Sequence, residues 1–313
     1  MQHIEEDLFK HGNVLFSDGS SLKTTNGLTT SLIAGKASMQ GYNESTGDMA
    51  RFRLISGFLQ SVSTLAVLAV DSGNRCVRLI DRRTNETGPV VGRCIGMDPD
   101  EPHIAVPFIS PSKVMYDVQD IKKIFIVDYK TIYLFELRGV TVSLYDSANK
   151  EIRGLTQDFA TGDLYVLFKQ HITWVKYNDV KVNRRIAGTP SPLCILNEGP
   201  FSQSRFGDLR DIVLINNGTQ IIVADFRNQR IRVLDLRGNM TTSFCGHFDQ
   251  LCNNSIVPES LGVVNGSLYI GSNTSIMRIQ GAASILATKK DILNSSMYIY
   301  VNQAMPSPTP SSH

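Results

Sequence analysis

The side chains of this chain that could do chemistry are few and widely spaced. Its 313 residues contain no GxGxxG segment, no phosphate-binding loop, no HExxH pair and no GxSxG turn. Three of the six histidines, His103, His171 and His247, lie in different parts of the chain. They could hold a metal together if the fold returned all three to one axis. Their unlike settings in the repeat described below argue against this, so we expect no metal, no cofactor and no enzyme activity.

A second group of side chains is basic and is interleaved with the aromatic residues Tyr129 and Phe226. The group comprises Arg75, Lys130, Lys169, His171, Arg227 and Arg230. Such a mixture is typical of surfaces that bind anions or nucleic acids. The formal net charge of +2 argues against a dedicated RNA-binding protein, and a solvated rim without a binding role is the alternative interpretation.

Two segments that repeat each other indicate which elements position these residues. Residues 69–79 and 223–233 each run from an apolar strand through an Asp, with an Asn three residues later, into an alternating strand. Weaker copies bring the number of units to six, with register points at Asp18, Asp71, Asp128, Phe168, Asp225 and Ser272. The mean interval of about 51 residues is typical of four-stranded propeller blades.

The repeat predicts an all-β chain folded as a six-bladed β-propeller of four-stranded antiparallel blades. In the fifth unit we expect strands over residues 209–215, 220–224, 231–236 and 240–244, and the alternation through residues 230–233 is typical of a half-buried strand. The expected blades cover residues 1–37, 53–94, 110–146, 152–188, 208–246 and 258–291.

Two segments could supply the strand that closes the ring of a single domain over residues 1–302. Residues 4–9 could be the first strand of blade 1. Residues 297–301, inside a possible closing strand over 292–302, could complete that blade instead. Residues 303–313 are rich in Pro and Ser and are predicted to be a linker or stalk.

The Asp–Asn pairs Asp71–Asn74 and Asp225–Asn228 are interpreted as structural. Asp and Asn side chains accept hydrogen bonds from backbone groups two or three residues further on, and they tolerate left-handed backbone conformations. We therefore expect these carboxylates to stabilise the turns between second and third strands, and not to act in catalysis.

The five cysteines are not spaced as a zinc site, because none forms a CxxC pair. A hairpin around residues 84–86 that pairs Arg82 with Gly88 would also place Cys76 opposite Cys94, close enough for a disulfide. Two buried thiols are the alternative. Cys245 and Cys252 could form a small second disulfide, and Cys194 is left over.

Asn-x-Ser/Thr sequons are more frequent than chance predicts. There are eight, against roughly three expected for this composition, at Asn43, Asn85, Asn217, Asn239, Asn253, Asn265, Asn273 and Asn294. Several fall in predicted hairpin turns, where a glycan fits. Turn composition alone is the competing explanation. The sequons and cysteines favour an extracellular or cell-surface location. Because residues 1–7 carry early acids and no apolar stretch of a signal peptide, we expect a cropped ectodomain.

The chain resembles the NHL-repeat family of propellers. The resemblance is carried by residues 223–225 with Asn228 and residues 231–233, by Asp71 with Asn74, and by the interblade segments 50–52 and 204–206. It implies a rigid ring that presents variable loops to an unknown protein or glycan partner, without insertion into a membrane by this segment. Two alternatives follow from relatives of this kind: a cytoplasmic NHL domain that binds RNA on its basic rim, and a metal-dependent lyase or lactonase with ligands such as Asp71, Asp128 and Asp225 around the channel.

Overall fold

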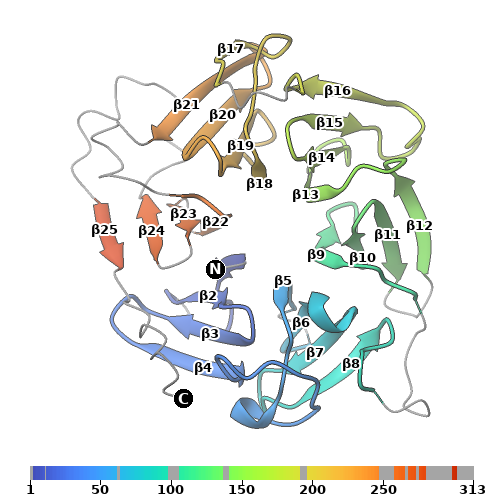
Figure 1. The fold of residues 1–313 in the computed structure, drawn as a ribbon, viewed down its shortest axis with the longest axis vertical. Helices are drawn as coiled ribbons and strands as arrows, with labels where there is room; N and C mark the ends of the chain where they lie inside the picture. Colours follow the sequence, from blue (N-terminus) through green and yellow to red (C-terminus); the bar gives the residue numbers. More distant parts are fainter. Residues whose placement is uncertain are drawn as a thin grey trace, which may run out of the picture.

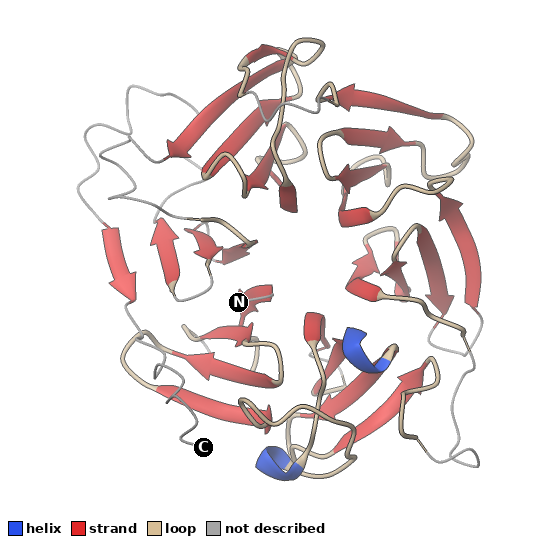
Figure 2. Ribbon diagram, viewed as in Figure 1, coloured by secondary structure: helices blue, strands red, loops and turns tan. Residues whose placement is uncertain are grey.

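The structure is a computed structural model, and it describes residues 3–10, 12–61, 64–97, 106–136, 141–190, 196–246, 257–264, 267–272, 275–279 and 298–301. Six antiparallel sheets stand around a central axis like the blades of a propeller (Figure 1). Two 3₁₀ turns, η1 (Gly47–Met49) and η2 (Ser72–Asn74), are the helices of the described part of the chain (Figure 2). The predicted all-β, six-bladed fold is confirmed.

Each blade takes its strands from consecutive residues, with the first strand nearest the axis. Blade 1 has β1 (His3–Glu6), β2 (Val14–Ser17), β3 (Ser21–Thr25) and β4 (Thr30–Gly35). Blade 2 has β5 (Ile55–Ser61), β6 (Ala66–Asp71), β7 (Cys76–Asp81) and β8 (Thr87–Val91). Blade 3 has β9 (Pro111–Asp117), β10 (Asp120–Asp128), β11 (Thr131–Glu136) and β12 (Thr141–Asp146).

The second half of the chain repeats this order. Blade 4 has β13 (Ile152–Gln157), β14 (Leu164–Phe168), β15 (Ile172–Val175) and β16 (Asn183–Ala187). Blade 5 has β18 (Leu209–Ile215), β19 (Gln220–Asp225), β20 (Arg230–Asp235) and β21 (Met240–Gly246), with a short fifth strand, β17 (Gly199–Pro200), outside β21. Blade 6 has β22 (Ser260–Val264), β23 (Ser267–Gly271), β24 (Ile276–Ile279) and β25 (Tyr298–Val301).

The ring closes where the first blade meets the last. Strand β1 is the inner strand of blade 1, and β25 is the outer strand of blade 6, so neither end of the chain crosses into the other blade. Ile4 packs into an apolar cluster with Tyr269 and Ile276 of blade 6. Gly262 permits the close approach, because a Cβ at this position would lie 2.4 Å from the carbonyl oxygen of Ile4.

The apolar core lies between neighbouring blades and not within them. The second strand of a blade is covered on both faces, and every residue of β6 and β14 is buried. Leu68 and Val70 of blade 2, for example, pack against Ile124 and Ile126 of blade 3. Each such aliphatic side chain contributes roughly 1.5–3 kcal/mol through its removal from water, so the ring depends on all six junctions.

A charged brace spans the centre of the ring. The Asp211 carboxylate in blade 5 accepts a hydrogen bond from Lys113 Nζ of blade 3 at 3.0 Å and another from the Leu261 backbone N–H of blade 6 at 2.9 Å. Asp211 projects from a bulge between Leu209 and Ile212, and bulges of this kind re-aim side chains. The brace therefore joins inner strands of three blades.

The predicted Cys76–Cys94 disulfide is present, but the hairpin register behind that prediction was wrong. Strand β7 pairs with β8 as Leu79 with Gly88 because the hairpin turn lies at residues 82–85, so Arg82 does not face Gly88. A bulge at Val77/Arg78 changes the register again. Cys94 lies beyond the end of β8, after a turn at Gly92 with φ of 84°. The two Cα atoms are 5.0 Å apart, within the usual range for a disulfide.

We predict that non-reducing peptide mapping of the secreted protein recovers Cys76 joined to Cys94. Replacement of both residues by Ser opens a loop with a sequence separation of 18, which costs about 3 kcal/mol of unfolding free energy. Urea unfolding of the double variant and of the parent protein measures this loss. Recovery of both residues as free thiols from the secreted parent would contradict the structure.

Candidate binding face

One face of the ring carries the turns between second and third strands together with the segments that join consecutive blades. Three of these joining segments have about twenty residues: residues 36–54 from β4 to β5, named arm 1, residues 92–110 from β8 to β9, and residues 188–208 from β16 to β18, named arm 2. Residues 98–105 and 191–195 of these segments lie outside the described part of the chain. In Figure 1 both arms reach the periphery of the ring, arm 1 beside β4 and β8 and arm 2, which contains β17, beside β21. The corresponding segment between β12 and β13 is much shorter, residues 147–151.

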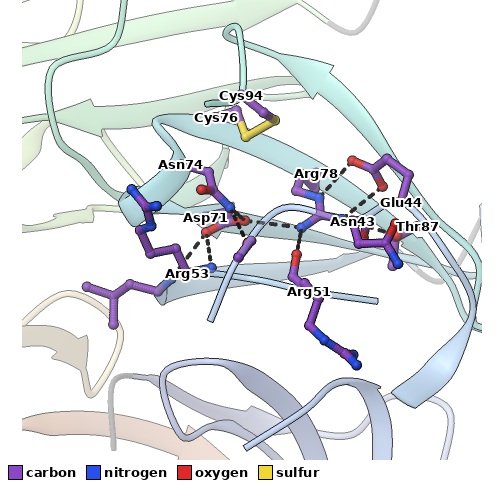
Figure 3. Close-up of a disulfide and its surroundings, with 12 residues drawn as sticks. Asn43, Glu44, Arg51, Arg53, Asp71, Asn74, Cys76, Arg78, Thr87 and Cys94 are labelled. Carbon is purple, nitrogen blue, oxygen red and sulfur yellow. Dashed lines mark hydrogen bonds and ion pairs between the residues drawn. A yellow bond between two sulfur atoms is a disulfide. The ribbon is translucent and has the colours of Figure 1, made fainter. Parts of the chain in front are cut away.

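A buried arginine holds arm 1. The Arg78 side chain of β7 is fully buried, and its guanidinium donates to both carboxylate oxygens of Glu44 at 2.9 Å (Figure 3). The same group donates to the backbone oxygens of Arg51 at 2.6 Å and Asn43 at 2.9 Å, and it pairs with Asp71 at 3.1 Å. One side chain thus fixes both the outgoing part of the arm, at Asn43, and its returning part, at Arg51. The planar guanidinium of arginine, with five N–H donors, allows this.

Aromatic rings complete the surroundings of this guanidinium. Its carbon lies 4.1 Å from the ring centroid of Phe52 and 5.1 Å from that of Tyr42, both of which belong to arm 1. Tyr42 in turn packs on the cluster that contains the Cys76–Cys94 disulfide. Cation–π contacts of a desolvated arginine add to its hydrogen bonds, so Arg78 is held to the arm by both its edge and its face.

The Asp71 carboxylate ties the end of arm 1 to the blade. One oxygen accepts from the backbone N–H groups of Arg53 at 3.0 Å and Leu54 at 3.2 Å, and the other accepts from Asn74 Nδ2 at 2.7 Å. The role is structural, as the sequence predicts, but the backbone partners differ from those expected. They lie 17 or 18 residues earlier in the chain, because the arm returns to the same turn.

Arm 2 is held by the same device. Arg232 pairs with Asp225 at 3.5 Å and donates to the backbone oxygens of Arg205 at 3.2 Å and Asn197 at 2.9 Å. The Phe206 ring lies beside its guanidinium. Each residue of this set follows its counterpart around Arg78 by the same interval, which equals three blades. The two halves of the ring therefore share one arm-anchoring unit.

The expectation that β20 is half-buried was wrong, because the Arg232 side chain points into the protein and is fully buried. A bulge at Ile231/Arg232, matched by one at Val77/Arg78, aims both arginines under the arms. The sequence carried a signal for this, since Arg78 and Arg232 stand at the same distance after Asp71 and Asp225. Periodicity alone cannot separate an exposed arginine from a buried and paired one.

The arms also cover the outer edges of two blades. Arm 1 forms a bridge between Thr46 and Glu86, and arm 2 pairs Gly199 with Thr241 and Pro200 with Met240. An uncovered outer strand presents unpaired backbone groups that other chains can pair with. Blades 2 and 5 are thus the blades whose edges the arms protect.

We predict that Arg232→Met lowers the unfolding free energy by roughly 3–5 kcal/mol, because it leaves Asp225 as a buried carboxylate without its counter-charge. Burial already raises the pKa of Asp225 in spite of Arg232. Adding Asp225→Asn should recover part of the loss, since an amide oxygen can still accept from the Gly207 and Asp208 N–H groups. Urea unfolding measures each variant.

The matched control is Arg227→Ala in the neighbouring turn, where the side chain is exposed. This variant should unfold within about 0.5 kcal/mol of the parent protein, as surface substitutions usually do. A loss from Arg232→Met as small as that of Arg227→Ala would contradict the anchoring role.

The predicted basic residues all lie at turns between second and third strands, in four different blades. Arg75, Lys169 and Arg227 are exposed, whereas Lys130 and Arg230 are partly buried. His171 differs from the rest, since it is 8% exposed and stacks on Phe168 with ring centroids 4.6 Å apart. Burial, followed by the nearby charges of Lys150 and Arg185, lowers the pKa of His171 to about 4. It therefore adds packing to this face and no positive charge at neutral pH.

We predict a pH dependence of stability from His171. Its pKa is lower in the folded protein than the ordinary 6.5, so the unfolded chain takes up the proton first. The contribution of His171 to the unfolding free energy is fully present above about pH 6.5. It is lost as the pH drops toward 4, a loss of roughly 3 kcal/mol. The difference in urea stability between the parent protein and His171→Phe, measured from pH 7.5 to 4, isolates it. Parallel curves for the two proteins would refute the assignment.

The described sequons differ in how well they suit a glycan. Asn85, Asn217 and Asn239 occupy hairpin turns with φ between 52° and 59°, and Asn217 and Asn239 are exposed. Asn43 is exposed too, but its Nδ2 donates to the Met49 oxygen at 2.8 Å inside arm 1. The other predicted positions, Asn253, Asn265, Asn273 and Asn294, lie outside the described residues, as do Cys194, Cys252 and the side chain of Cys245.

Acidic side chains around the axis are engaged by the protein itself. Asp71 and Asp225 accept from arm amides as above, and Asp128 accepts from the N–H groups of Ile109 and Ser110. Burial raises the pKa of Asp128, while these hydrogen bonds oppose the rise. Among the described residues no three His, Cys, Asp or Glu side chains gather as metal ligands. His103 and His247 lie outside the described residues.

Comparison with known proteins supports the fold. No family model and no curated protein matches the chain. A chain of a nidogen/laminin complex superposes with a TM-score of 0.61 at 14% identity, over 87% of this chain and 90% of that one. An auxiliary nutrient binding protein from Bacteroides thetaiotaomicron gives 0.64 at 10% identity, over 87% and 66%. Virginiamycin B lyase from Staphylococcus aureus gives 0.55 at 11%, over 90% and 81%.

At these identities the likeness shows a β-propeller and no more, and the neighbours include both binding proteins and a lyase. The described helices are too short and too polar to cross a membrane.

Proposed function

We propose that this chain is an extracellular binding module of the NHL-repeat type, which holds a protein partner on its two arms. The observation that carries the proposal is the anchoring of both arms by Arg78 and Arg232, since each arginine fixes backbone oxygens of its arm. A surface fixed before binding loses little conformational entropy when a partner arrives. Anchored loops are therefore the natural contact region of this ring.

Arm 1 presents apolar side chains outward. Met39 is 46% exposed and Met49, on η1, is 58% exposed. Methionine is enriched in protein interfaces because its flexible thioether adapts to varied surfaces. The exposed Arg53 at the end of the same arm is also of a type favoured at interfaces. This composition supports a protein partner.

Three further observations support an extracellular setting and a partner outside the cell. The Cys76–Cys94 disulfide is of a kind that persists in oxidising compartments. The excess of sequons includes three in hairpin turns, Asn85, Asn217 and Asn239. One similar structure, the nidogen/laminin complex, contains an assembled protein pair.

The experiment is binding of the purified secreted propeller to an array of extracellular protein domains, compared with Met49→Glu. We expect saturable binding to a member of the array, weakened at least tenfold by Met49→Glu with an unchanged melting temperature. The matched control is Arg237→Glu, an exposed residue in the β20–β21 turn of blade 5, which should bind like the parent protein.

The rival functions give different results in the same protein. Binding of single-stranded RNA that weakens on neutralisation of Arg75, Lys169 and Arg227, with no protein ligand found, would replace the proposal by nucleic-acid recognition. Turnover of a small substrate that does not respond to changes in the arms would replace it by an enzyme function.

A further inference from the structure

A groove of about 710 Å³ opens at the outer side of the junction between blades 4 and 5. One wall is the blade 4 ladder of β14, β15 and β16, and the other is the start of arm 2 and its return beside β21. Its lining consists of Tyr165, Trp174, residues 184–189, residues 200–202, Leu236 and Asn239. The groove is separate from the turns of the basic group and from the Met-bearing arm 1.

The blade 4 wall combines an aromatic face with a cation. Tyr165, Trp174 and Arg184 are cross-strand neighbours on β14, β15 and β16. The Arg184 guanidinium carbon lies 5.5 Å from the Trp174 ring centroid, and Trp174 Nε1 donates to Asp163 at 3.1 Å. The hydrogen bond fixes the indole, so Trp174 forms a rigid floor with an exposed arginine at its rim.

The edge of blade 4 is open along this groove. In the described residues β16 pairs with β15 and with no strand on its outer side, whereas arms cover the same edge in blades 2 and 5. Residues 184–187 of β16 line the groove. An extended segment of another chain can add to such an edge through main-chain hydrogen bonds, with side-chain pockets that set specificity.

The charge of the groove selects the occupant. Its charged lining residues are Arg184 and Arg185, both exposed, and no carboxylate lines it among the described residues. Arg184 lies on the face of Trp174, whereas Arg185, opposite Thr173, lies on the other face of the sheet. Guanidinium groups favour carboxylate partners because they can form two parallel hydrogen bonds with them. An edge strand that is bordered by arginines therefore suits an extended acidic segment better than a basic or neutral one.

We propose that this groove binds an acidic, extended peptide segment of a protein partner, added beside β16 with a carboxylate near Arg184 and an apolar side chain against Trp174 on the same face of the sheet. The inference rests on the proposed function, because one wall of the groove is arm 2, and it names the chemistry of the partner segment that contacts this arm.

The chain contains one tryptophan, so indole fluorescence reports on this groove alone. The probe is a blocked hexapeptide Glu-Ser-Val-Ser-Glu-Ser, which places glutamate and valine on one face of an extended chain. It is titrated into the whole protein before and after glycosidase treatment, since Asn239 lines the groove. We expect a saturable change in Trp174 emission with this peptide and none with the analogue that has lysine in place of glutamate. Arg184→Glu should weaken the binding at least tenfold.

Lys181→Glu is the matched control, because it makes the same charge reversal at an exposed position of the same hairpin outside the groove. It should bind within about twofold of the parent protein, and far-ultraviolet circular dichroism should show both variants folded. An emission that does not respond to the acidic peptide at millimolar concentration overturns the inference. So does equal binding by Arg184→Glu, or a response to a sulfated heparin disaccharide in place of the peptide.

Failure here is distinguishable from failure of the proposed function. A partner from the extracellular array that still binds Arg184→Glu at full strength would remove the groove and leave the arms as the contact. Peptide binding in the groove, without any partner whose binding depends on Met49, would keep the groove as a binding site and remove arm 1 as the contact.

Discussion

This propeller depends on the burial of two guanidinium groups. Arg78 is buried between blade 2 and arm 1, and Arg232 is buried between blade 5 and arm 2. A buried cation costs several kcal/mol unless its charge is paired and its donors find partners. All three nitrogens of Arg78 donate, whereas Nε of Arg232 has no hydrogen-bond partner in the described part of the chain. The partners are carboxylates of the turn and backbone oxygens of the arm. The arm must therefore adopt one conformation to satisfy the charge, and the buried charge in turn specifies the arm.

The apolar junctions and the buried charges do different work in this molecule. Aliphatic side chains between blades supply most of the driving force for closing the ring, and the brace of Lys113 and Asp211 joins strands that those junctions do not bring into contact. The charged units add little net stability by comparison, but they turn two irregular segments of about twenty residues into defined surfaces. At β16 no arm covers the edge in the described residues, and a groove lies beside that strand.

Much of the fold could be predicted from the sequence because the repeat marks each turn between second and third strands. The strands of blade 5 lie within one or two residues of those expected. The disulfide was predicted from a hairpin register with its turn at residues 84–86, whereas the turn lies at residues 82–85. The bulge at Val77/Arg78 changes the register again, and neither feature leaves a clear mark in a single sequence. His171 looked like a member of a basic rim, and its packing on Phe168 depends on a turn conformation that composition does not reveal.

The candidate surfaces were harder to predict for a related reason. The anchoring role of Arg232 requires oxygens of Asn197 and Arg205, which are far from it in sequence and carry no side-chain signal. The groove beside Trp174 exists because arm 2 covers blade 5 and not blade 4. Both features arise from the path of the arms, and strand periodicity contains no information about that path.

Native-state hydrogen exchange at the arm amides tests the central claim most directly. The account predicts that the N–H groups of Arg53, Leu54, Gly207 and Asp208, which donate to Asp71 and Asp225, exchange as slowly as amides of the neighbouring strands β6 and β19. Exchange at the rates of an unstructured chain, while β6 and β19 remain protected, would show that the arms are not fixed and would contradict the account.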